Sequence, residues 1–382
     1  MINTKYDVVI LGGGPAGLAA AIAIRTKTDA SVLLVDRQHQ GEVRVGENCP
    51  PETVLLLKQL GVAKEFYRGG HQTCPGYASV WGRDTPGYND FIVNPQGPAW
   101  RLNRQAFDKM LADRAESCGA QISWSTRFID AQKHSNEAEG FTLRLVRKSE
   151  DRECEVQARF VIDATGSIAS FAGKMDINKS VDDELFATVR FSTLAHGRGS
   201  KQIQLEAVEH GWCYHSLLPA EKVVSMIVTE KKHLVSLREN EFQGFDDALQ
   251  NTNLIGSSIA KLDLKESSYH TYCIRPGMLA AAEGKNWMAI GDAVASFDPI
   301  AAQGIYKGLS HGLQAGKKVM TWFENREHNN SNFSQQVKNQ YGDYLRNRNH
   351  VYSLERRWSN AHFWLNRSSN NIDYSQLIKN ES

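Results

Sequence analysis

Residues 6–17 read YDVVILGGGPAG, and this stretch decides the fold of the chain. Its apolar run, residues 8–11, is typical of a buried parallel strand. Three glycines follow at the GxGxxG spacing: Gly12 allows a tight turn, Gly14 lets a pyrophosphate approach the backbone, and Gly17 allows close helix packing. The stretch therefore predicts a strand, a turn and a helix that together bind a dinucleotide.

The residues after this loop complete the same prediction. A helix from Pro15 and Ala16 to about Arg25 would direct its N-terminus at the phosphates, where free N–H groups and the helix dipole favour an anion. Residues 31–35 predict a second strand, and the carboxylate of Asp36 at its end would accept hydrogen bonds from the adenosine ribose. We assign the neighbouring Arg37 to the same site. A glycine-rich turn without a ligand is the alternative, but strand, helix and acid together favour the dinucleotide.

A second glycine-containing signature lies about 280 residues further along the chain. Residues 287–293 read WMAIGDA, and Asp298, Pro299 and Gly304 follow. The two signatures together indicate FAD, bound by one domain that the chain builds from separated segments. An oxidoreductase is therefore the leading interpretation.

Composition narrows the function classes. The 382 residues are 41% hydrophobic and 23% charged, with a net charge of +1. This balance gives no electrostatic case for nucleic acid or an anionic membrane, and no apolar run approaches the ~20 residues that span a bilayer. The six cysteines show no CxxC pair, so we expect no metal site. Because the first strand begins almost at once, we expect no signal peptide and a cytoplasmic location.

Hydrophobic periodicity outlines the organisation of the chain. It predicts a helix over residues 103–118 and a long helix after Gly304. Strands are predicted over residues 121–133, 141–148, 154–164, 185–194, 202–208, 212–218 and 223–229. Between about 182 and 275 strands dominate, and the polar end is predicted to be helical up to residue 365.

This order predicts an α/β fold in which a Rossmann FAD-binding domain is interleaved with a mostly antiparallel β-sheet domain. Residues 1–70, 100–180 and 276–320 would form the FAD-binding domain, and residues 71–99 and 181–275 the substrate-binding sheet. Residues 321–366 would form C-terminal helices, and residues 367–382 a frayed tail.

The motifs resemble the FAD-dependent monooxygenase superfamily with the glutathione-reductase-type fold, which includes aromatic hydroxylases and flavin-dependent tryptophan halogenases. Residues 101–108, RLNRQAFD, resemble its helix whose arginine reaches the FAD phosphates; Arg104 is the better-placed candidate. The resemblance implies that Asp292 binds ribityl or ribose hydroxyls and that residues 46–48 form a strap over the isoalloxazine. The further residues implied to bind FAD are Gly46, Glu47, Asn48, Gly166, Gly291, Pro299, Gln303, Gly304 and Ile305.

Departures from the superfamily patterns narrow the chemistry. Residues 164–166 read ATG where NADPH-using hydroxylases carry Asp-Gly, so we expect electrons from a separate flavin reductase or a free reduced flavin. Halogenases place a catalytic lysine near residues 71–81, and this chain has none there. Residues 299–304, PIAAQG, lack the halogenases' glutamate and serine, and only Trp212 remains of their tryptophan-x-tryptophan motif. These departures favour oxygen transfer over halogenation.

The C-terminal stretch, residues 344–364, resembles the LodB/GoxB-like flavoproteins of cysteine tryptophylquinone (CTQ) biogenesis. The resemblance implies a protein substrate: a precursor amino-acid oxidase, such as glycine or lysine oxidase, whose tryptophan is hydroxylated. Packing is the alternative role for Tyr352, Trp358 and Phe363. Three alternative functions remain: a small-molecule aromatic hydroxylase, a lipid-type flavin reductase, and a flavin-dependent maturation chaperone without oxygenation.

Four residues are candidates for the substrate pocket. Trp212 and Tyr214 would line it from the sheet, and Cys49 from the flavin side, although a small packed residue is the simpler role for this cysteine. His215 is the candidate base when the oxidised indole regains aromaticity. A structural histidine in a strand is the alternative.

Overall fold

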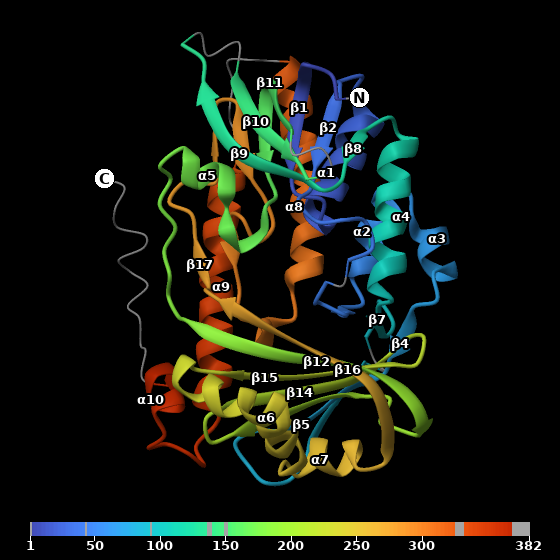
Figure 1. Ribbon diagram of the computed structural model, residues 1–382, viewed down its shortest axis with the longest axis vertical. Coiled ribbons are helices and arrows are strands. Elements are labelled where there is room, and N and C mark those ends of the chain that lie inside the picture. Colours follow the sequence, from blue (N-terminus) through green and yellow to red (C-terminus); the bar gives the residue numbers. More distant parts are fainter. Residues whose placement is uncertain are drawn as a thin grey trace. The chain divides into compact units, whose positions relative to one another are not determined.

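The computed structural model describes residues 2–42, 44–91, 94–135, 140–148, 152–324 and 332–368 (Figure 1). The chain divides into two compact units, each assembled from three segments. The first unit comprises Met1–His71, Leu102–Asp182 and Pro276–Lys338. The second comprises Gln72–Arg101, Asp183–Arg275 and Asn339–Ser382.

A largely parallel sheet forms the centre of the first unit. Its strand order is β18-β19-β11-β1-β2-β8, and β10 joins β9 to β11 at one side. Strand β1 pairs in parallel with both β2 and β11, and β11 pairs in parallel with β19. The strands span Lys5–Leu11 (β1), Val32–Val35 (β2), Gln121–Ser123 (β8), Thr126–Lys133 (β9), Phe141–Arg147 (β10), Arg152–Asp163 (β11), Glu283–Gly284 (β18) and Trp287–Ala289 (β19). The two glycine-containing signatures, distant in sequence, therefore begin on strands of one sheet.

Helices and short elements complete this unit. They are α1 (Pro15–Lys27), β3 (Asn48–Cys49), α2 (Thr53–Gln59), α3 (Ala63–Arg68), α4 (Arg104–Ser117), η3 (Gly166–Ile168), α5 (Ser170–Lys174), β17 (Gly277–Met278), β20 (Ala295–Ser296), η4 (Pro299–Ala301) and α8 (Gly304–Glu324). The predicted helix over residues 103–118 is confirmed as α4. Its N-cap is Asn103, whose side-chain oxygen accepts the Ala106 N–H at 3.2 Å.

Glycines of α8 pack directly against α1. A Cβ on Gly312 would lie 2.6 Å from the Ala19 Cβ, and a Cβ on Gly316 would lie 2.5 Å from the Ala23 Cβ. Real side chains do not approach so closely, so both positions must lack one. This glycine–alanine seam fixes the distance between α1, which begins within the first signature, and α8, which follows the second.

The second unit is built on a seven-stranded sheet in the order β16-β12-β15-β14-β13-β5-β6. Its strands span Gly76–Val80 (β5), Gly87–Asp90 (β6), Leu185–Gly197 (β12), Ile203–Val208 (β13), Gly211–Leu218 (β14), Lys222–Thr229 (β15) and Leu262–Ile274 (β16); β4 (Gln72–Cys74) pairs with β7 (Ala99–Arg101) beside it. All pairs in the seven-stranded sheet are antiparallel except β5 with β13. The mostly antiparallel sheet is confirmed.

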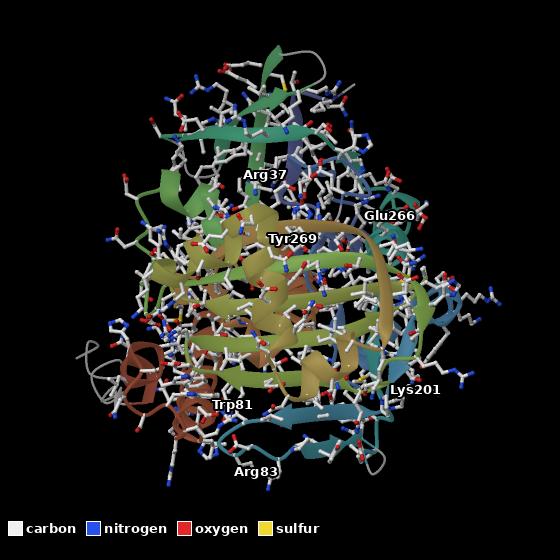
Figure 2. The ribbon with its side chains drawn as sticks, turned by 60° about the horizontal axis from the view of Figure 1, so that its bottom comes forward. Arg37, Trp81, Arg83, Lys201, Glu266 and Tyr269 are labelled. Atoms are coloured by element: carbon white, nitrogen blue, oxygen red, sulfur yellow. The ribbon has the colours of Figure 1, made fainter. Side chains whose placement is uncertain are left out.

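Two helices that the strand-dominated sequence pattern did not predict cover one face of this sheet (Figure 2). They are α6 (Lys231–Gln250) and α7 (Leu254–Ile259). Phe245, Leu249 and Ile255 from these helices pack with Cys213 and Ile227 of the sheet. Helix α6 is interrupted at residues 239–242, where three successive residues have positive φ. This break divides its apolar pattern and hides the helical period.

The chain then runs through α9 (Phe333–Ser353) and α10 (His362–Ser368). The fraying predicted to start at residue 367 is wrong for its first residue: Arg367 is only 3% exposed and held by ion pairs. Ser368 ends α10, and the remainder of that predicted tail, residues 369–382, lies outside the described residues. Within the described part of the chain, no helix is long and apolar enough to cross a membrane.

Candidate functional site

The three glycines of the first signature serve two different purposes. Gly12 has φ +113°, and a Cβ there would lie 2.1 Å from the Ala164 carbonyl oxygen. A Cβ on Gly17 would lie 1.9 Å from the Gly12 carbonyl oxygen. At Gly14, by contrast, φ is −81° and a Cβ would meet only the Arg44 Nη1, at 3.5 Å, among the described atoms. The fold itself requires glycine at positions 12 and 17, whereas Gly14 keeps a space open for a ligand.

Helix α1 begins beside this open space. Gly14 is its N-cap and supplies no capping side chain, and Pro15 is its first residue. The first N–H groups of a helix have no partner within the helix, so those of Ala16 and Gly17 are available to an anion, whereas the Leu18 N–H donates to the Gly14 carbonyl oxygen at 3.0 Å. A phosphate group fits this position.

Asp36 follows β2 and lies against the glycine loop. Its Oδ2 accepts the Gly13 N–H at 2.6 Å and pairs with Arg44 at 3.0 Å, while its Oδ1 accepts the Gln38 N–H at 2.7 Å. Arg44 also donates to the Gly13 carbonyl oxygen at 3.0 Å. Arg44 was not predicted from the sequence, because it lies in a segment without periodicity, and only the spatial approach to Gly13 reveals it.

Two cavities lie around this loop, and Arg44 lines both. The smaller, of about 220 Å³, is bounded by Gly12, Gly14, Asp36, Arg37 and Gly166 among others. The larger, of about 550 Å³, is lined by a predominantly polar set that includes Gly13, His39, Asn103, Gln105, Lys109 and Trp124. The predicted residues of the adenosine end therefore surround one cavity. The second cavity continues past Arg44 toward α4.

Arg104 opens α4 and contacts the segment predicted to be a strap over the isoalloxazine. Its guanidinium donates to the Gly46 carbonyl oxygen at 2.8 Å and to that of Val45, and pairs with Asp108 at 3.1 Å. Gly46 has φ +99°, and a Cβ there would lie 3.0 Å from the Arg104 Nη1. The structure thus joins the predicted arginine to the predicted strap.

Glu47 of this strap and Cys49, which follows it, are buried ionisable groups. Burial raises the pKa of Glu47 to about 7, against the opposing charge of Arg104, and its Oε1 has no hydrogen-bond partner among the described residues. The Glu47 carbonyl oxygen accepts the Leu102 N–H at 2.6 Å. Burial also raises the pKa of Cys49 to about 12, so this cysteine is a packed thiol rather than a nucleophile. Between them, Asn48 is half-buried.

Replacing Glu47 with glutamine should remove a pH-dependent loss of stability. The folded-state pKa of about 7 lies above the ordinary 4.5, so the stabilising contribution is complete below pH 4.5 and is lost as the pH rises to about 7. E47Q should therefore equal the wild type near pH 4.5 and exceed it by up to about 3 kcal/mol at pH 8. Urea unfolding of the apoprotein at both pH values measures this.

The control for this experiment is E116Q, which changes an exposed carboxylate on α4. That carboxylate loses little water on folding, so the control curve should run parallel to that of the wild type. If the stability of E47Q also ran parallel to that of the wild type across this pH range, the raised pKa of the buried Glu47 would be contradicted.

The second signature forms a turn between β19 and α8. Gly291 has φ +62° and donates its N–H to the His311 Nδ1 at 3.2 Å. Asp292 is 48% exposed at its side chain. Asp298 caps η4 by accepting the Ile300 N–H at 3.0 Å. Of the predicted residues that follow, Pro299 begins η4, Gln303 and Gly304 are exposed at the start of α8, and Ile305 is buried.

Gly166 sits where β11 passes into η3 and lines the smaller cavity. Its position is set by Asp163, whose carboxylate accepts N–H groups of Thr165, Phe171 and Ala172 at 3.0, 2.9 and 3.0 Å. Burial raises the pKa of Asp163 despite these hydrogen bonds. The ATG segment is thus held by a buried acid on the same sheet as the glycine loop.

In the second unit, Trp212 and Tyr214 lie on one face of β14. Trp212 is 1% exposed, and its Nε1 donates to the Tyr352 hydroxyl at 3.0 Å. Tyr214 packs beside Cys74, Ala99 and Ile203. Trp212 is therefore held by the C-terminal helices, which restricts it to a supporting role in any pocket.

His215 does not fit the predicted role of catalytic base. Side chains alternate along a strand, and Cys213, two residues before His215, packs under α6 and α7. His215 therefore lies on that face, opposite to Trp212 and Tyr214. It is 2% exposed, its Nδ1 lies 3.0 Å from the Ser225 hydroxyl, and burial lowers its pKa to about 4. This geometry favours the alternative, in which His215 has a structural role in the strand.

Comparison with known proteins decides the family. Residues 5–329 match the family model described as FAD binding domain. The chain belongs to this FAD-binding family. It is an FAD-dependent oxidoreductase, and the cofactor predicted from the two signatures is confirmed.

Individual relatives of this FAD-binding protein support the narrower resemblance. It is 24% identical to the putative FAD-dependent oxidoreductase LodB of Marinomonas mediterranea, over 95% of this chain and 97% of LodB. Its fold matches that of the myxobacterial halogenase CndH with a TM-score of 0.84 at 18% identity, covering 98% of this chain and 89% of CndH. It also matches the fold of the peptidyl tryptophan dihydroxylase QhpG with a TM-score of 0.75 at 19% identity, covering 95% of this chain and 78% of QhpG. The predicted resemblance to LodB-like flavoproteins and the fold class are confirmed.

The residues present fit FAD. The open position at Gly14 and the start of α1 suit the pyrophosphate, and Asp36 with Arg37 and Gly166 bounds a cavity at the adenosine end. The start of α8 and the strap would hold the isoalloxazine. Bound FAD supplies redox chemistry that no side chain can perform.

Proposed function

We propose that this protein is an FAD-dependent monooxygenase that hydroxylates a tryptophan of a precursor amino-acid oxidase, such as glycine or lysine oxidase, during CTQ maturation. In this reaction one oxygen atom of O₂ enters a ring C–H bond and the other leaves as water, with two electrons from reduced FAD. A separate flavin reductase would supply those electrons, because the chain carries the ATG form at residues 164–166.

The extent of the similarity to LodB carries this proposal. The FAD-binding family model ends at residue 329, whereas the LodB match spans 95% of this chain and must include most of the residues after 329. QhpG, which shares the fold, is described as essential for tryptophylquinone cofactor biogenesis. Because the fold of the halogenase CndH also covers 98% of this chain, it is the sequence similarity of the C-terminal residues to LodB, and not the presence of these helices, that favours LodB-like chemistry.

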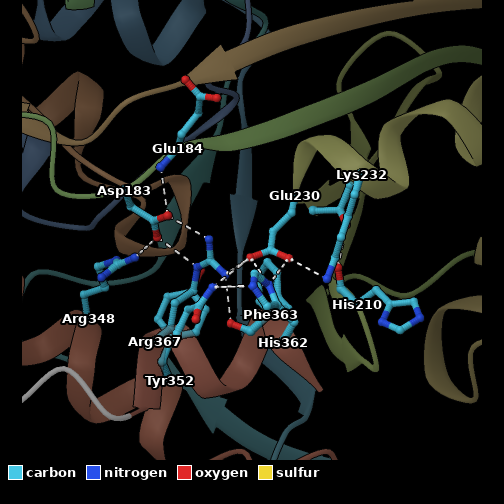
Figure 3. Close-up of polar contacts among 12 residues, drawn as sticks. Asp183, Glu184, His210, Glu230, Lys232, Arg348, Tyr352, His362, Phe363 and Arg367 are labelled. Carbon is cyan, nitrogen blue, oxygen red and sulfur yellow. Dashed lines mark hydrogen bonds and ion pairs between the residues drawn. The ribbon is translucent and has the colours of Figure 1, made fainter. Parts of the chain in front are cut away.

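In the structure the second unit includes α10 and the part of α9 from Asn339 onward. Arg367 donates to Asp183 at 2.7 Å and to Glu230 at 3.1 Å, and Arg348 also pairs with Asp183 (Figure 3). His362 lies 2.9 Å from Glu230. Both arginines are at most 5% exposed. These buried ion pairs attach α9 and α10 to the ends of β12 and β15.

Aromatic packing reinforces the same attachment. Trp364 is fully buried and its Nε1 donates to the Val208 carbonyl oxygen at 3.0 Å, while the Trp81 Nε1 donates to that of Val351 at 2.8 Å. Tyr352 and Phe363 are both buried, which favours the packing role considered for them. The C-terminal residues that resemble LodB-like sequences can thus stabilise the second unit without contacting the substrate.

The halogenase alternative is disfavoured by particular positions. Residues 71–81 supply no lysine to the segment around β4 and β5, and residues 299–304 contain no glutamate or serine. The fold similarity to CndH is compatible with either chemistry, because one fold hosts many reactions. Oxygen transfer is the reaction that needs neither residue.

The test is a parallel incubation of the holoprotein with a flavin reductase, NADH and O₂. One sample contains an unmodified amino-acid oxidase precursor, and the other contains free tryptophan and simple phenols. Intact mass is expected to show added oxygen on the precursor, located at tryptophan by peptide mapping. Oxygen on the small aromatics alone would establish a metabolic hydroxylase instead. Stable precursor binding without added oxygen would support a maturation chaperone.

A further inference from the structure

Two lysines converge on Asp292, the acid of the second FAD signature. The Lys307 Nζ lies 2.8 Å from the Asp292 Oδ1. The Lys179 Nζ donates to the Asp292 main-chain carbonyl oxygen at 3.0 Å and to that of Ser167 at 2.9 Å. One lysine thus holds the side chain of the acid and the other holds its backbone. Neither lysine was assigned to the site from the sequence.

The burial of Lys307 makes this arrangement costly for the fold. Lys307 is 5% exposed in the first turns of α8. Its ammonium also donates to the Ala295 carbonyl oxygen and lies 3.8 Å from the centre of the Phe297 ring. Removing an ammonium from water is unfavourable even when it is paired, and an apolar side chain of similar size is often tolerated better. A buried lysine at this position therefore indicates a role beyond packing.

Lys179 ties together segments that are distant in sequence. It follows α5 and reaches both the η3 segment, which lines the smaller cavity, and the turn that carries Asp292. Burial lowers the pKa of Lys179 to about 8, and Lys307 acts in the same direction while Asp292 and Asp163 oppose the shift. The two lysines are thus close enough to affect one another.

The arrangement leaves Asp292 able to bind a ligand. Its side chain remains 48% exposed although Lys307 occupies Oδ1. A fixed carboxylate can accept hydrogen bonds from ligand hydroxyls, but alone it would repel a nearby phosphate. The ammonium groups of Lys307 and Lys179 beside this carboxylate offset part of that repulsion.

We propose that Lys307 and Lys179 are positioning residues that hold Asp292 in place for FAD and offset its negative charge. Lys307 acts through the Asp292 carboxylate, and Lys179 through the backbone of the turn. This inference concerns FAD binding alone and does not depend on the proposed tryptophan substrate.

A double-mutant cycle tests the proposal on the apoprotein, with FAD affinity measured by fluorescence quenching. K307M and D292N should each raise the FAD dissociation constant about 10-fold, equivalent to about 1.4 kcal/mol. The double variant K307M/D292N should bind no more weakly than D292N, because Lys307 acts through Asp292. K179M should also weaken binding, by about 5-fold. The control K317M removes an exposed lysine of the same helix and should bind FAD as the wild type does.

Two results would overturn the proposal. One is unchanged FAD affinity in K307M and K179M. The other is an FAD dissociation constant of K307M/D292N that rises by the product of the two single-variant increases. That result would mean that Lys307 acts on FAD independently of Asp292. Thermal unfolding of each apoprotein separates a folding defect from a binding defect; if K307M does not fold, K179M, at a half-buried position, carries the test. The measurement reads FAD affinity and requires no substrate. Its result is therefore independent of whether the proposed tryptophan substrate is correct.

Discussion

Replacing Gly14 with alanine should abolish tight FAD binding and leave the fold intact. The backbone at Gly14 has an extended conformation that alanine adopts readily, and the new Cβ would meet only the end of the flexible Arg44 side chain, at 3.5 Å, among the described atoms. The methyl group would instead occupy space that the pyrophosphate needs. We expect the FAD dissociation constant to rise about 100-fold, equivalent to about 3 kcal/mol, with unchanged apoprotein stability.

The informative comparison is G12A, only two residues away. There a Cβ would lie 2.1 Å from the Ala164 carbonyl oxygen, and φ is +113°. G12A should therefore destabilise the apoprotein itself, in thermal unfolding without any flavin. If G14A instead lowers apoprotein stability as much as G12A does, the space at Gly14 belongs to the fold and not to the ligand.

Replacing Gly312 with valine should break the seam between α1 and α8. A Cβ at this position already lies 2.6 Å from the Ala19 Cβ and 2.7 Å from the Ala16 carbonyl oxygen. Both are short or main-chain groups that cannot rotate away, so the helices must separate. Overpacking of a core contact costs about 1–3 kcal/mol and occasionally more, and we expect the upper end of this range because these contacts cannot relax. Urea unfolding of the apoprotein should show this loss, and FAD affinity should fall as well because the turn of the second signature leads directly into α8.

Gly342 in α9 provides the matched control. A Cβ there would meet only the Arg346 Nη1, at 3.4 Å, among the described atoms. G342A should stabilise the protein by about 0.5–1 kcal/mol, because alanine favours the helix more than glycine does. A loss of stability in G342A, or none in G312V, would contradict the packing described for these helices.

The sequence was most informative where a local pattern serves the ligand and the fold together. The glycine loop, Asp36 and the Gly291–Asp292 turn could be predicted because each combines a strand, a special backbone conformation and a polar group at fixed spacing. Arg44, Lys179 and Lys307 could not, because each reaches the site from a segment with no such spacing. Long flexible side chains acquire their partners only in the folded structure.

His215 shows what a strand pattern alone leaves open. The alternation Trp212, Cys213, Tyr214, His215 already places the histidine on the opposite face from the two aromatic residues. What the sequence did not reveal was which face is covered by helices, because α6 is interrupted at residues 239–242 and its period is lost. The catalytic role of His215 therefore stays a prediction, and its burial under the helices favours the structural alternative.

The parallel pairing of β11 with β19 has a consequence for how the protein is made. Translation delivers β1, α1 and β2 within the first 35 residues, yet their sheet gains β19 only after residue 289, and α1 gains its partner helix only after residue 304. Contacts of such high sequence separation form slowly, and unfinished sheets with exposed apolar faces are prone to aggregation. On the ribosome, most of the chain must therefore emerge before the nucleotide site can close around its flavin.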